Sequence, residues 1–265
     1  MPKLDSGLRT LREETDLRIV DCHAHLWSEA DARVLVDEAN RLRIERVCVS
    51  CLSHWDWSEE GNAGRGNSLV RSAVQDNPKL LGYVYVDPTV GDMALKQIDE
   101  YTGMPPFIGI KLWISCRAND RRVHPVLERA SSSGLVVLAH AWRRGSRLSK
   151  GYQTLPSEVA DLASSFPEVP IIMAHIGGDW ENGALEVADA ENVAVDTCGS
   201  INESGMIESA VDAVGSARVL FGSDAPSSGY LPNIGKIISA EIPLKEKVDI
   251  LGSNFARLAG IAKHR

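Results

Sequence analysis

Val20-Asp21-Cys22-His23-Ala24-His25 is an apolar run that ends in two histidines. Residues two apart in a β-strand point to the same side, so His23 and His25 are expected to face one point. Two converging imidazoles form half of a site for a divalent ion such as zinc. The same pattern returns twice, because later apolar runs are followed directly by His140 and His175.

Eight short runs rich in β-branched and apolar residues recur along the chain. They are nearly continuous in hydrophobicity rather than alternating, which is typical of parallel strands that are covered on both faces. The predicted strands are 18–22, 46–52, 80–86, 107–112, 135–139, 170–174, 193–197 and 218–222.

Amphipathic segments separate most of these strands. Residues 32–42, 157–166 and 205–214 each place apolar side chains along one helical face, and Ser28 is a candidate cap for the first. Residues 244–259 indicate final helical structure. Eight strand–helix units without a linker predict an α/β fold, a (β/α)8 TIM barrel, as a single domain over residues 1–265. A doubly wound open sheet is the alternative, because a count of strands does not establish closure.

The composition is that of a soluble globular protein, with 265 residues, 44% hydrophobic and 24% charged. A net charge of -8 argues against nucleic-acid or anionic-membrane partners and leaves a small-molecule substrate as the expected partner. No apolar run reaches the roughly 18 residues that span a bilayer. Residues 1–18 are polar and show no signal peptide, so a cytoplasmic protein is expected. A homo-oligomer is compatible with this composition.

The five cysteines are an odd number, which argues against a disulfide framework. Cys48-Val49-Ser50-Cys51 matches the C-x-x-C pattern of redox and zinc motifs. It lies in a predicted strand, where positions three apart face opposite sides, rather than at the start of a helix. Buried, unreactive thiols are the favoured interpretation.

Polar residues at the carboxyl ends of barrel strands converge on one site. A single histidine there is most simply a hydrogen-bonded core residue. Four histidines together with an aspartate predict a shared ion, because buried polar clusters need partners or a cation. In strand order, the strand-end residues are His23, His25, Lys111, His140, His175 and Asp224.

This set of residues resembles the amidohydrolase superfamily. Within it, the chain is similar to amidohydrolase family 2, which contains hydrolases, lactonases and non-oxidative decarboxylases. The resemblance runs from Val20-Asp21-Cys22-His23-Ala24-His25 to Asn254-Phe255-Ala256-Arg257-Leu258. Between them it includes Val86-Asp87-Pro88, Gly109-Ile110-Lys111-Leu112 and Gly222-Ser223-Asp224.

The resemblance implies four ligands for one divalent ion: His23, His25, His140 and Asp224. Zinc is the expected ion, and manganese, iron and cobalt suit the same ligands. His175 would lie beside the ion as a catalytic acid or base, or bind a second ion. Lys111 would be either a carboxylated bridge between two ions or a positive group facing substrate or a structural neighbour. One ion is favoured over two.

The implied chemistry uses a metal-activated water on a small cyclic or aromatic ester, lactone or amide. Asp224 would accept and pass on the proton of that water, and His175 would help to polarise a carbonyl. With an aromatic or unsaturated acid, His175 would instead protonate carbon while carbon dioxide leaves. A barrel that keeps its ion only for structure or ligand sensing is a third, non-enzymatic interpretation.

All six tryptophans follow predicted strand ends, which predicts an aromatic ring around the mouth and a flat or apolar substrate. The alternative is that they cap the core. Those proposed to contact substrate are Trp27, Trp113, Trp142 and Trp180.

Two loops near the mouth complete the predicted site. Arg143 and Arg144 follow His140 directly, and one of them is a candidate clamp for a substrate carboxylate. The usual alternative for such a charge run is a solvated loop face. The long loop 53–67 contains three glycines and is predicted to be a mobile flap over the barrel mouth.

Overall fold

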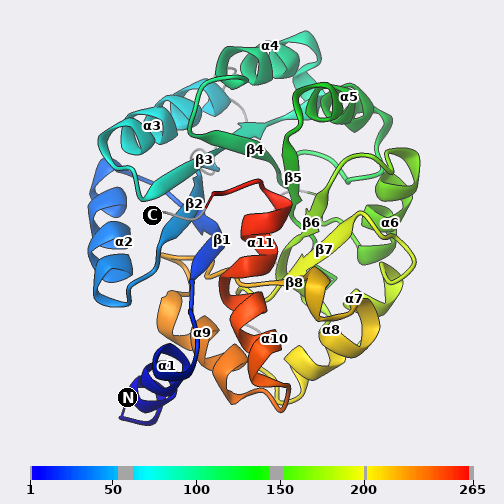
Figure 1. The fold of residues 1–265 in the computed structure, drawn as a ribbon. Coiled ribbons are helices and arrows are strands. Elements are labelled where there is room, and N and C mark those ends of the chain that lie inside the picture. The colour runs from blue at the N-terminus through cyan, green and yellow to red at the C-terminus, as the bar shows by residue number, and fades with distance from the viewer. Residues whose placement is uncertain (1, 53–61, 144–151, 200–201, 263–265) are drawn as a thin grey trace.

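The fold is a (β/α)8 barrel, seen in a computed structural model that describes residues 2–52, 62–143, 152–199 and 202–262. Eight parallel strands follow one another around a single sheet in chain order (Figure 1). This confirms the predicted fold class. The strands are β1 (Val20–His25), β2 (Arg46–Ser50), β3 (Leu80–Val86), β4 (Phe107–Leu112), β5 (Val136–Ala139), β6 (Ile171–Met173), β7 (Val193–Asp196) and β8 (Val219–Leu220).

The barrel closes between its first and last strands. β8 covers only Val219–Leu220, and the backbone that follows it completes the pairing with β1. The N–H of Cys22 donates to the carbonyl of Phe221 at 3.0 Å, and the N–H of His25 donates to that of Ala225 at 2.7 Å. These bonds exclude the open-sheet alternative, because an open sheet leaves its two edge strands unpaired.

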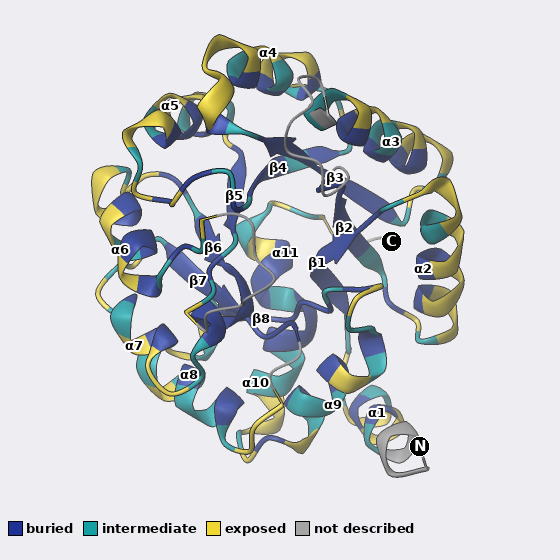
Figure 2. Ribbon diagram, turned by 180° about the vertical axis from the view of Figure 1, so that it is seen from behind, coloured by how far each residue is buried: buried dark blue, intermediate teal, exposed yellow. Residues whose placement is uncertain are grey.

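Helices surround the sheet, and Figure 2 shows buried strands inside a ring of helices with exposed outer faces. The predicted segments 157–166 and 205–214 correspond to α6 and α8, each within a residue or two. Ser28 is the residue at the N-cap of α2, as predicted. The helices are α1 (Pro2–Glu14), α2 (Glu29–Arg41), α3 (Asn62–Asp76), α4 (Asp92–Tyr101), α5 (His124–Ser133), α6 (Pro156–Ser165), α7 (Gly183–Glu186), α8 (Met206–Val214), α9 (Tyr230–Ser239), α10 (Leu244–Val248) and α11 (Asn254–Leu258).

The predicted loop 53–67 is shorter than the sequence suggests. α3 already begins at Asn62, so two of the three glycines lie in a helix. A Cβ on Gly66 would lie 3.2 Å from the carbonyl oxygen of Cys51, so glycine lets α3 approach the end of β2 closely. The rest of the predicted flap, 53–61, lies outside the described residues.

The apolar core has two parts. The larger lies between the sheet and the helices, and the smaller fills the interior of the barrel. All five cysteines are buried and free, which agrees with the expectation of unpaired thiols. The interior cluster consists of Val20, Cys22, Cys48, Leu81, Tyr83, Val136, Leu138, Ile172, Ala174, Ala194, Leu220 and Phe255.

The end of the chain plugs the barrel at the side where the strands begin. Helix α11 lies across the centre of the barrel in Figure 1 and packs against β1 and β8. Its Phe255 is fully buried in the interior cluster. The preceding π-helix, Asp249–Ser253, lies so close to the segment before β1 that a Cβ on Gly252 would lie 2.2 Å from the carbonyl oxygen of Arg18.

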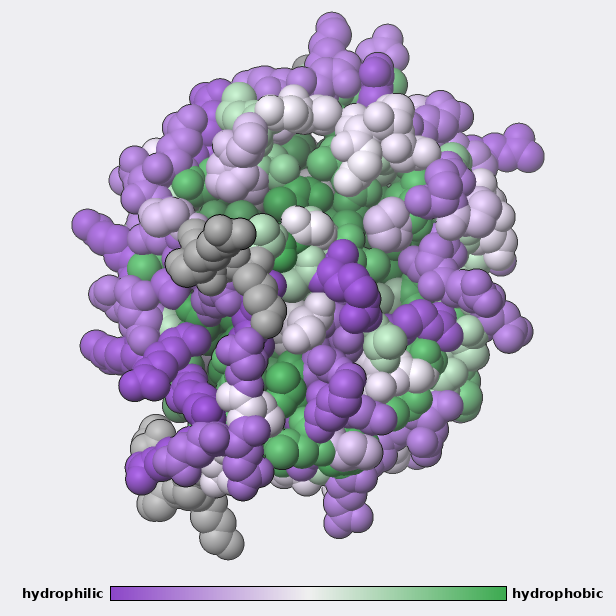
Figure 3. Space-filling view, viewed as in Figure 1, coloured by the Kyte–Doolittle hydropathy of each residue, from purple (hydrophilic) through white to green (hydrophobic). Residues whose placement is uncertain are grey.

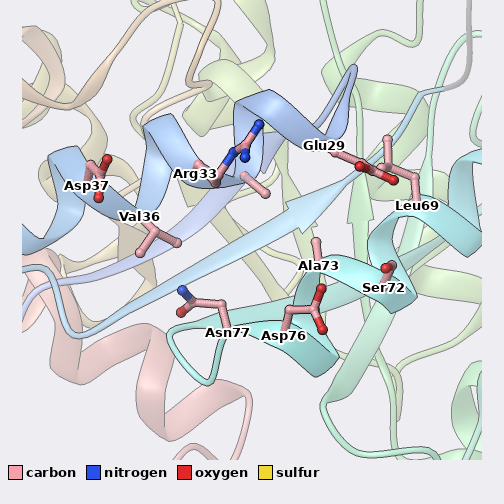
Figure 4. A pocket seen from close by; sticks show the side chains of 10 residues that line it. Glu29, Arg33, Val36, Asp37, Leu69, Ser72, Ala73, Asp76 and Asn77 are labelled. Atoms are coloured by element: carbon pink, nitrogen blue, oxygen red, sulfur yellow. The ribbon is translucent and has the colours of Figure 1, made fainter.

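The outer surface of the barrel is mostly hydrophilic on the face seen in Figure 3. A groove between α2 and α3 is lined by Glu29, Arg33, Asp37, Asp76 and the apolar Leu69, among others (Figure 4). Its carboxylates and arginine belong to α2 and α3, in the outer ring of helices. Within the described residues, no helix has the length and apolarity to cross a membrane.

Replacing Phe255 with alanine should destabilise the protein by about 3–5 kcal/mol, because the fully buried ring fills the base of the barrel. Urea unfolding followed by circular dichroism measures this loss. Leu258→Ala, at a partly exposed position of the same helix, is the control and should cost clearly less. Equal losses of unfolding free energy for the two variants would contradict the packing of Phe255 inside the barrel.

Candidate metal centre

Three predicted ligands meet at the seam between β1 and the segment after β8. The Nε2 atoms of His23 and His25 lie 3.1 Å apart, and Nε2 of His25 lies 3.2 Å from a carboxylate oxygen of Asp224. Their ligand atoms all fall within 4.8 Å of one another. The strand periodicity therefore placed the two imidazoles correctly.

The second nitrogen of each imidazole is held by a neighbour. Nδ1 of His23 lies 2.8 Å from a carboxylate oxygen of Asp196, at the end of β7, and Nδ1 of His25 lies 3.0 Å from the hydroxyl of Ser50. A carboxylate can only accept, so the Nδ1–H of His23 donates to Asp196. This leaves the lone pair of His23 on Nε2, facing His25.

This arrangement fits a divalent cation. Metal–nitrogen bonds of about 2.0–2.1 Å place neighbouring ligand nitrogens on one ion roughly 3 Å apart, as these two are. The lone pair on Nε2 of His23 is also crowded, because the ammonium nitrogen of Lys111 lies 3.1 Å away on another side. One lone pair cannot satisfy two donors well, whereas a cation uses it together with His25 and Asp224.

Burial keeps the imidazoles uncharged. It lowers the pKa of His23 to about 3 and also lowers the pKa values of His25 and His140. Burial opposes ionisation of Asp224, but its hydrogen bond with His25 and the nearby imidazoles outweigh this and lower the pKa of the carboxyl below its usual range. Neutral imidazoles and an ionised carboxylate are the protonation states that a metal needs.

Lys111 lies deep in the site at the end of β4. Its side chain is fully buried, and burial lowers its pKa to about 8. Its nitrogen contacts Nε2 of His23, so a cation held there would favour the uncharged amine. The contact places Lys111 against a ligand of the candidate site, and its role stays a prediction.

His140 lies near these residues but is turned toward another partner. Its Nε2 lies 3.0 Å from the side-chain oxygen of Gln153, and its ring centroid lies 5.1 Å from that of His175. It is not among the residues whose ligand atoms cluster with His23 and His25. Its assignment as a fourth ligand stays a prediction.

His175 lies on the other side of His23, with 5.1 Å between ring centroids. Its Nδ1 lies 3.1 Å from Sγ of Cys198, which follows β7, and its backbone N–H donates to Asp196 at 2.8 Å. Burial raises the pKa of Cys198 well above its usual range, so the thiol keeps its proton. The described residues thus contain a second cluster of possible ligand atoms, from His23, His175, Asp196 and Cys198.

Two predicted catalytic residues have left-handed backbones. The φ angles are 61° at His175, 47° at Ile176 and 55° at Asp224. Such a conformation costs roughly 1–2 kcal/mol for each residue with a Cβ. The chain continues left-handed after Ile176 through two glycines, Gly177 and Gly178, which adopt this conformation without that cost.

The carboxylate of Asp21 fixes the loop that carries Asp224. It accepts from the hydroxyl of Ser223 at 2.6 Å, from the backbone N–H of Ser223 at 2.9 Å and from that of His23 at 3.0 Å. The N–H of Asp224 then donates to the carbonyl of His23 at 2.8 Å. These bonds bring Asp224 to the β1 histidines, although they come 200 residues apart in sequence.

The described tryptophans take different positions. The ring of Trp27 lies 5.9 Å from that of His25, and the ring of Trp142 lies 5.5 Å from that of His175, edge to face. Trp113 lines a small cavity with His140, while Trp180 packs against the outer core. Trp55 and Trp57 lie outside the described residues.

Arg143 is already paired with two carboxylates. Its guanidinium lies 3.2 Å from Asp179 and also forms an ion pair with Glu186. Both acidic residues belong to the segment after β6, so Arg143 ties that segment to the end of β5. Its partner in the predicted clamp, Arg144, lies outside the described residues.

Sequence reasoning missed several residues of the site: Asp21, Ser50, Gln153, Asp196 and Cys198. Asp196 carried a usable signal, because it is a carboxylate near the carboxyl end of a predicted strand, where the predicted ligands also lie. Gln153 and Cys198 lie in loops and gave no comparable signal.

Fold and site together define a class: barrel proteins that gather histidines and an aspartate at their strand ends. A model of the amidohydrolase family, family 2, matches residues 20–261, and the chain belongs to this family. This confirms the predicted resemblance. Among curated proteins, no relative matches.

Solved structures share the fold. 5-Carboxyvanillate decarboxylase from Sphingomonas paucimobilis has a TM-score of 0.74 at 15% identity, covering 93% of this chain and 100% of its own. Dihydroxybenzoic acid decarboxylase from Polaromonas sp. JS666, with bound manganese, has 0.68 at 14%, covering 94% and 98%. A probable 2-pyrone-4,6-dicarboxylic acid hydrolase from Acinetobacter baumannii has 0.64 at 15%, covering 92% and 100%.

The packing around the left-handed turn at His175 can be tested by mutation. A Cβ on Gly183 would lie 1.9 Å from the carbonyl oxygen of Ile176, so Gly183→Ala must displace that turn. We expect a loss of about 1–3 kcal/mol in unfolding free energy. Gly64→Ala in α3, whose Cβ would meet the side chain of Gln97 at 3.6 Å, is the control and should be neutral or stabilising. An unchanged unfolding midpoint for Gly183→Ala would be inconsistent with this packing.

Proposed function

We propose that this chain is a metal-dependent hydrolase that acts on a small cyclic or aromatic ester, lactone or amide. The observation that carries the proposal is the meeting of His23, His25 and Asp224, whose ligand atoms all lie within 4.8 Å of one another. Neutral imidazoles and an ionised carboxylate suit zinc, manganese, iron or cobalt. Family membership supports an enzyme of this general type.

The proposed ligands are His23, His25 and Asp224, with His140 completing the set once it turns from Gln153. A divalent ion, when bound, supplies Lewis acidity and lowers the pKa of a coordinated water to about 7. Asp196 holds the ring of His23 in the orientation and tautomer that ligation requires. The hydroxyl of Ser50, 3.0 Å from Nδ1 of His25, orients that ring.

Asp224 and His175 divide the proton transfers. Asp224, whose backbone N–H donates to the carbonyl of His23, accepts a proton on its carboxylate from the attacking water and later delivers it to the leaving group. Cys198 occupies Nδ1 of His175, so Nε2 is the ring nitrogen left to donate to the substrate carbonyl. The left-handed backbones at both positions place these side chains without reorganisation during the reaction.

The aromatic surroundings support a flat substrate. Trp27 and Trp142 each contact a site histidine, so a planar ring can pack against apolar surface beside the candidate ligands. Arg143 is neutralised by Asp179 and Glu186, so a substrate carboxylate would have to displace one of these acids to bind it.

A second candidate is non-oxidative decarboxylation of an aromatic or unsaturated acid. It uses the same residues, with His175 protonating the carbon from which carbon dioxide departs. The fold-level likeness to aromatic-acid decarboxylases, with TM-scores of 0.68 to 0.74, supports this second candidate.

A metal-binding experiment tests the site without a substrate. His25→Ala should lower the affinity for Zn²⁺ or Mn²⁺ by at least about tenfold to a hundredfold, since it removes a ligand rather than a supporting group. Isothermal titration of the metal-stripped protein measures this affinity. His124→Ala on α5, where the ring contacts Phe166, is the matched control and should bind as the wild type does. Loss of binding in both variants, or in neither, would contradict the assignment.

A substrate panel tests the reaction. The zinc- or manganese-loaded enzyme should hydrolyse members of a set of aromatic lactones, esters and amides, and Asp224→Asn should lower kcat by about 10²–10⁴-fold. Carbon dioxide release from hydroxybenzoates and related acids is measured in parallel. If the enzyme turns over only the acids, decarboxylation replaces hydrolysis as the proposed reaction.

A further inference from the structure

Cys198 is a buried thiol that the proposed reaction does not use. It is fully buried, and its Sγ lies 3.1 Å from Nδ1 of His175 and 3.1 Å from Nδ1 of His23. The carboxylate of Asp196 lies in the same cluster. Sulfur, nitrogen and oxygen ligand atoms thus gather on the side of His23 that faces away from His25.

The protons in this cluster can be counted. The Nδ1–H of His23 donates to Oδ2 of Asp196, while Oδ1 of Asp196 accepts the backbone N–H groups of His175 and Cys198. Oδ2 therefore retains a lone pair. The thiol contributes one further proton to its contact with His175, and a cation can take the place of that proton.

We propose that Sγ of Cys198, Nδ1 of His175 and Oδ2 of Asp196 form a second metal site, selective for a soft divalent ion such as Cd²⁺ or excess Zn²⁺. On binding, the thiol releases its proton to solvent, and the sulfur lone pair bonds to the ion without any change of oxidation state. The thiolate sets the selectivity, because sulfur ligands favour zinc and softer ions over manganese and magnesium. The site of His23, His25 and Asp224 offers only nitrogen and oxygen.

The backbone around Cys198 is held in place for such a site. The ammonium group of Lys236 in α9 donates to the carbonyls of Thr197 and Gly199, at 3.0 and 2.9 Å. A Cβ on Gly199 would lie 2.9 Å from Nδ1 of His175, so glycine allows the ring to approach the loop. His175 is the member of the cluster with exposed surface, at 6%, while His23, Asp196 and Cys198 are fully buried.

The consequence for activity rests on the proposed function of His175. An imidazole that gives its Nδ1 lone pair to a cation keeps its proton on Nε2, the nitrogen proposed to donate to the substrate carbonyl. A second ion at Nδ1 would therefore leave this donor in place.

Cadmium titration of the metal-stripped protein tests the site directly. The wild type should bind two Cd²⁺ ions and develop the ultraviolet thiolate-to-Cd²⁺ charge-transfer band. Cys198→Ser should lose the band, and its affinity for the second Cd²⁺ ion should fall by at least about tenfold to a hundredfold. Cys116→Ser, at another buried cysteine, is the matched control and should keep both. A band that is absent from the wild type, or that persists in Cys198→Ser, overturns the proposal.

A second measurement needs no variant. In ¹¹³Cd NMR of the wild type, the second ion should give a resonance shifted strongly downfield, as sulfur ligation produces, and the first should not. Two resonances both typical of nitrogen and oxygen ligands would overturn the proposal. Because neither readout uses a substrate, a failure of the proposed hydrolase activity would leave these results unchanged and distinguishable.

Discussion

The hydrogen bond from His23 to Asp196 is the interaction on which the site depends. It runs between β1 and β7, with both side chains fully buried, at 2.8 Å. Because the acceptor is a carboxylate, it fixes which nitrogen of His23 carries the proton and which presents a lone pair. The neighbouring groups are arranged around the two ring nitrogens: Lys111 and His25 lie at Nε2, and Cys198 lies at Nδ1.

Periodicity predicted the parts of the structure that depend on local sequence. The runs 80–86 and 107–112 became β3 and β4 with the predicted bounds, because strands covered on both faces are apolar at every position. His23 and His25 converge because a strand repeats every two residues. The last predicted strand, 218–222, is longer than β8, although backbone beyond β8 still bonds to β1 at the seam that holds Asp224.

The remaining features depend on contacts between distant segments. No local pattern indicates that Asp196 reaches His23, because the stagger of strands around a barrel decides such pairs. Nor does one indicate that Gln153 reaches His140, because Gln153 lies in a loop. Arg143 illustrates the same limit. Its position after a histidine-ended strand suggested a free cation, while two acids from the segment after β6 neutralise it.

The plug at the base of the barrel bears on how the polypeptide is made. β1 pairs with backbone at 221–225, and Phe255 enters the interior cluster from helix α11. During synthesis, β1 can pair with β2 early, but its other edge stays unpaired until residues 221–225 have been made. Until then its apolar edge is exposed, so the nascent chain should depend on chaperones more than a protein built from local contacts does.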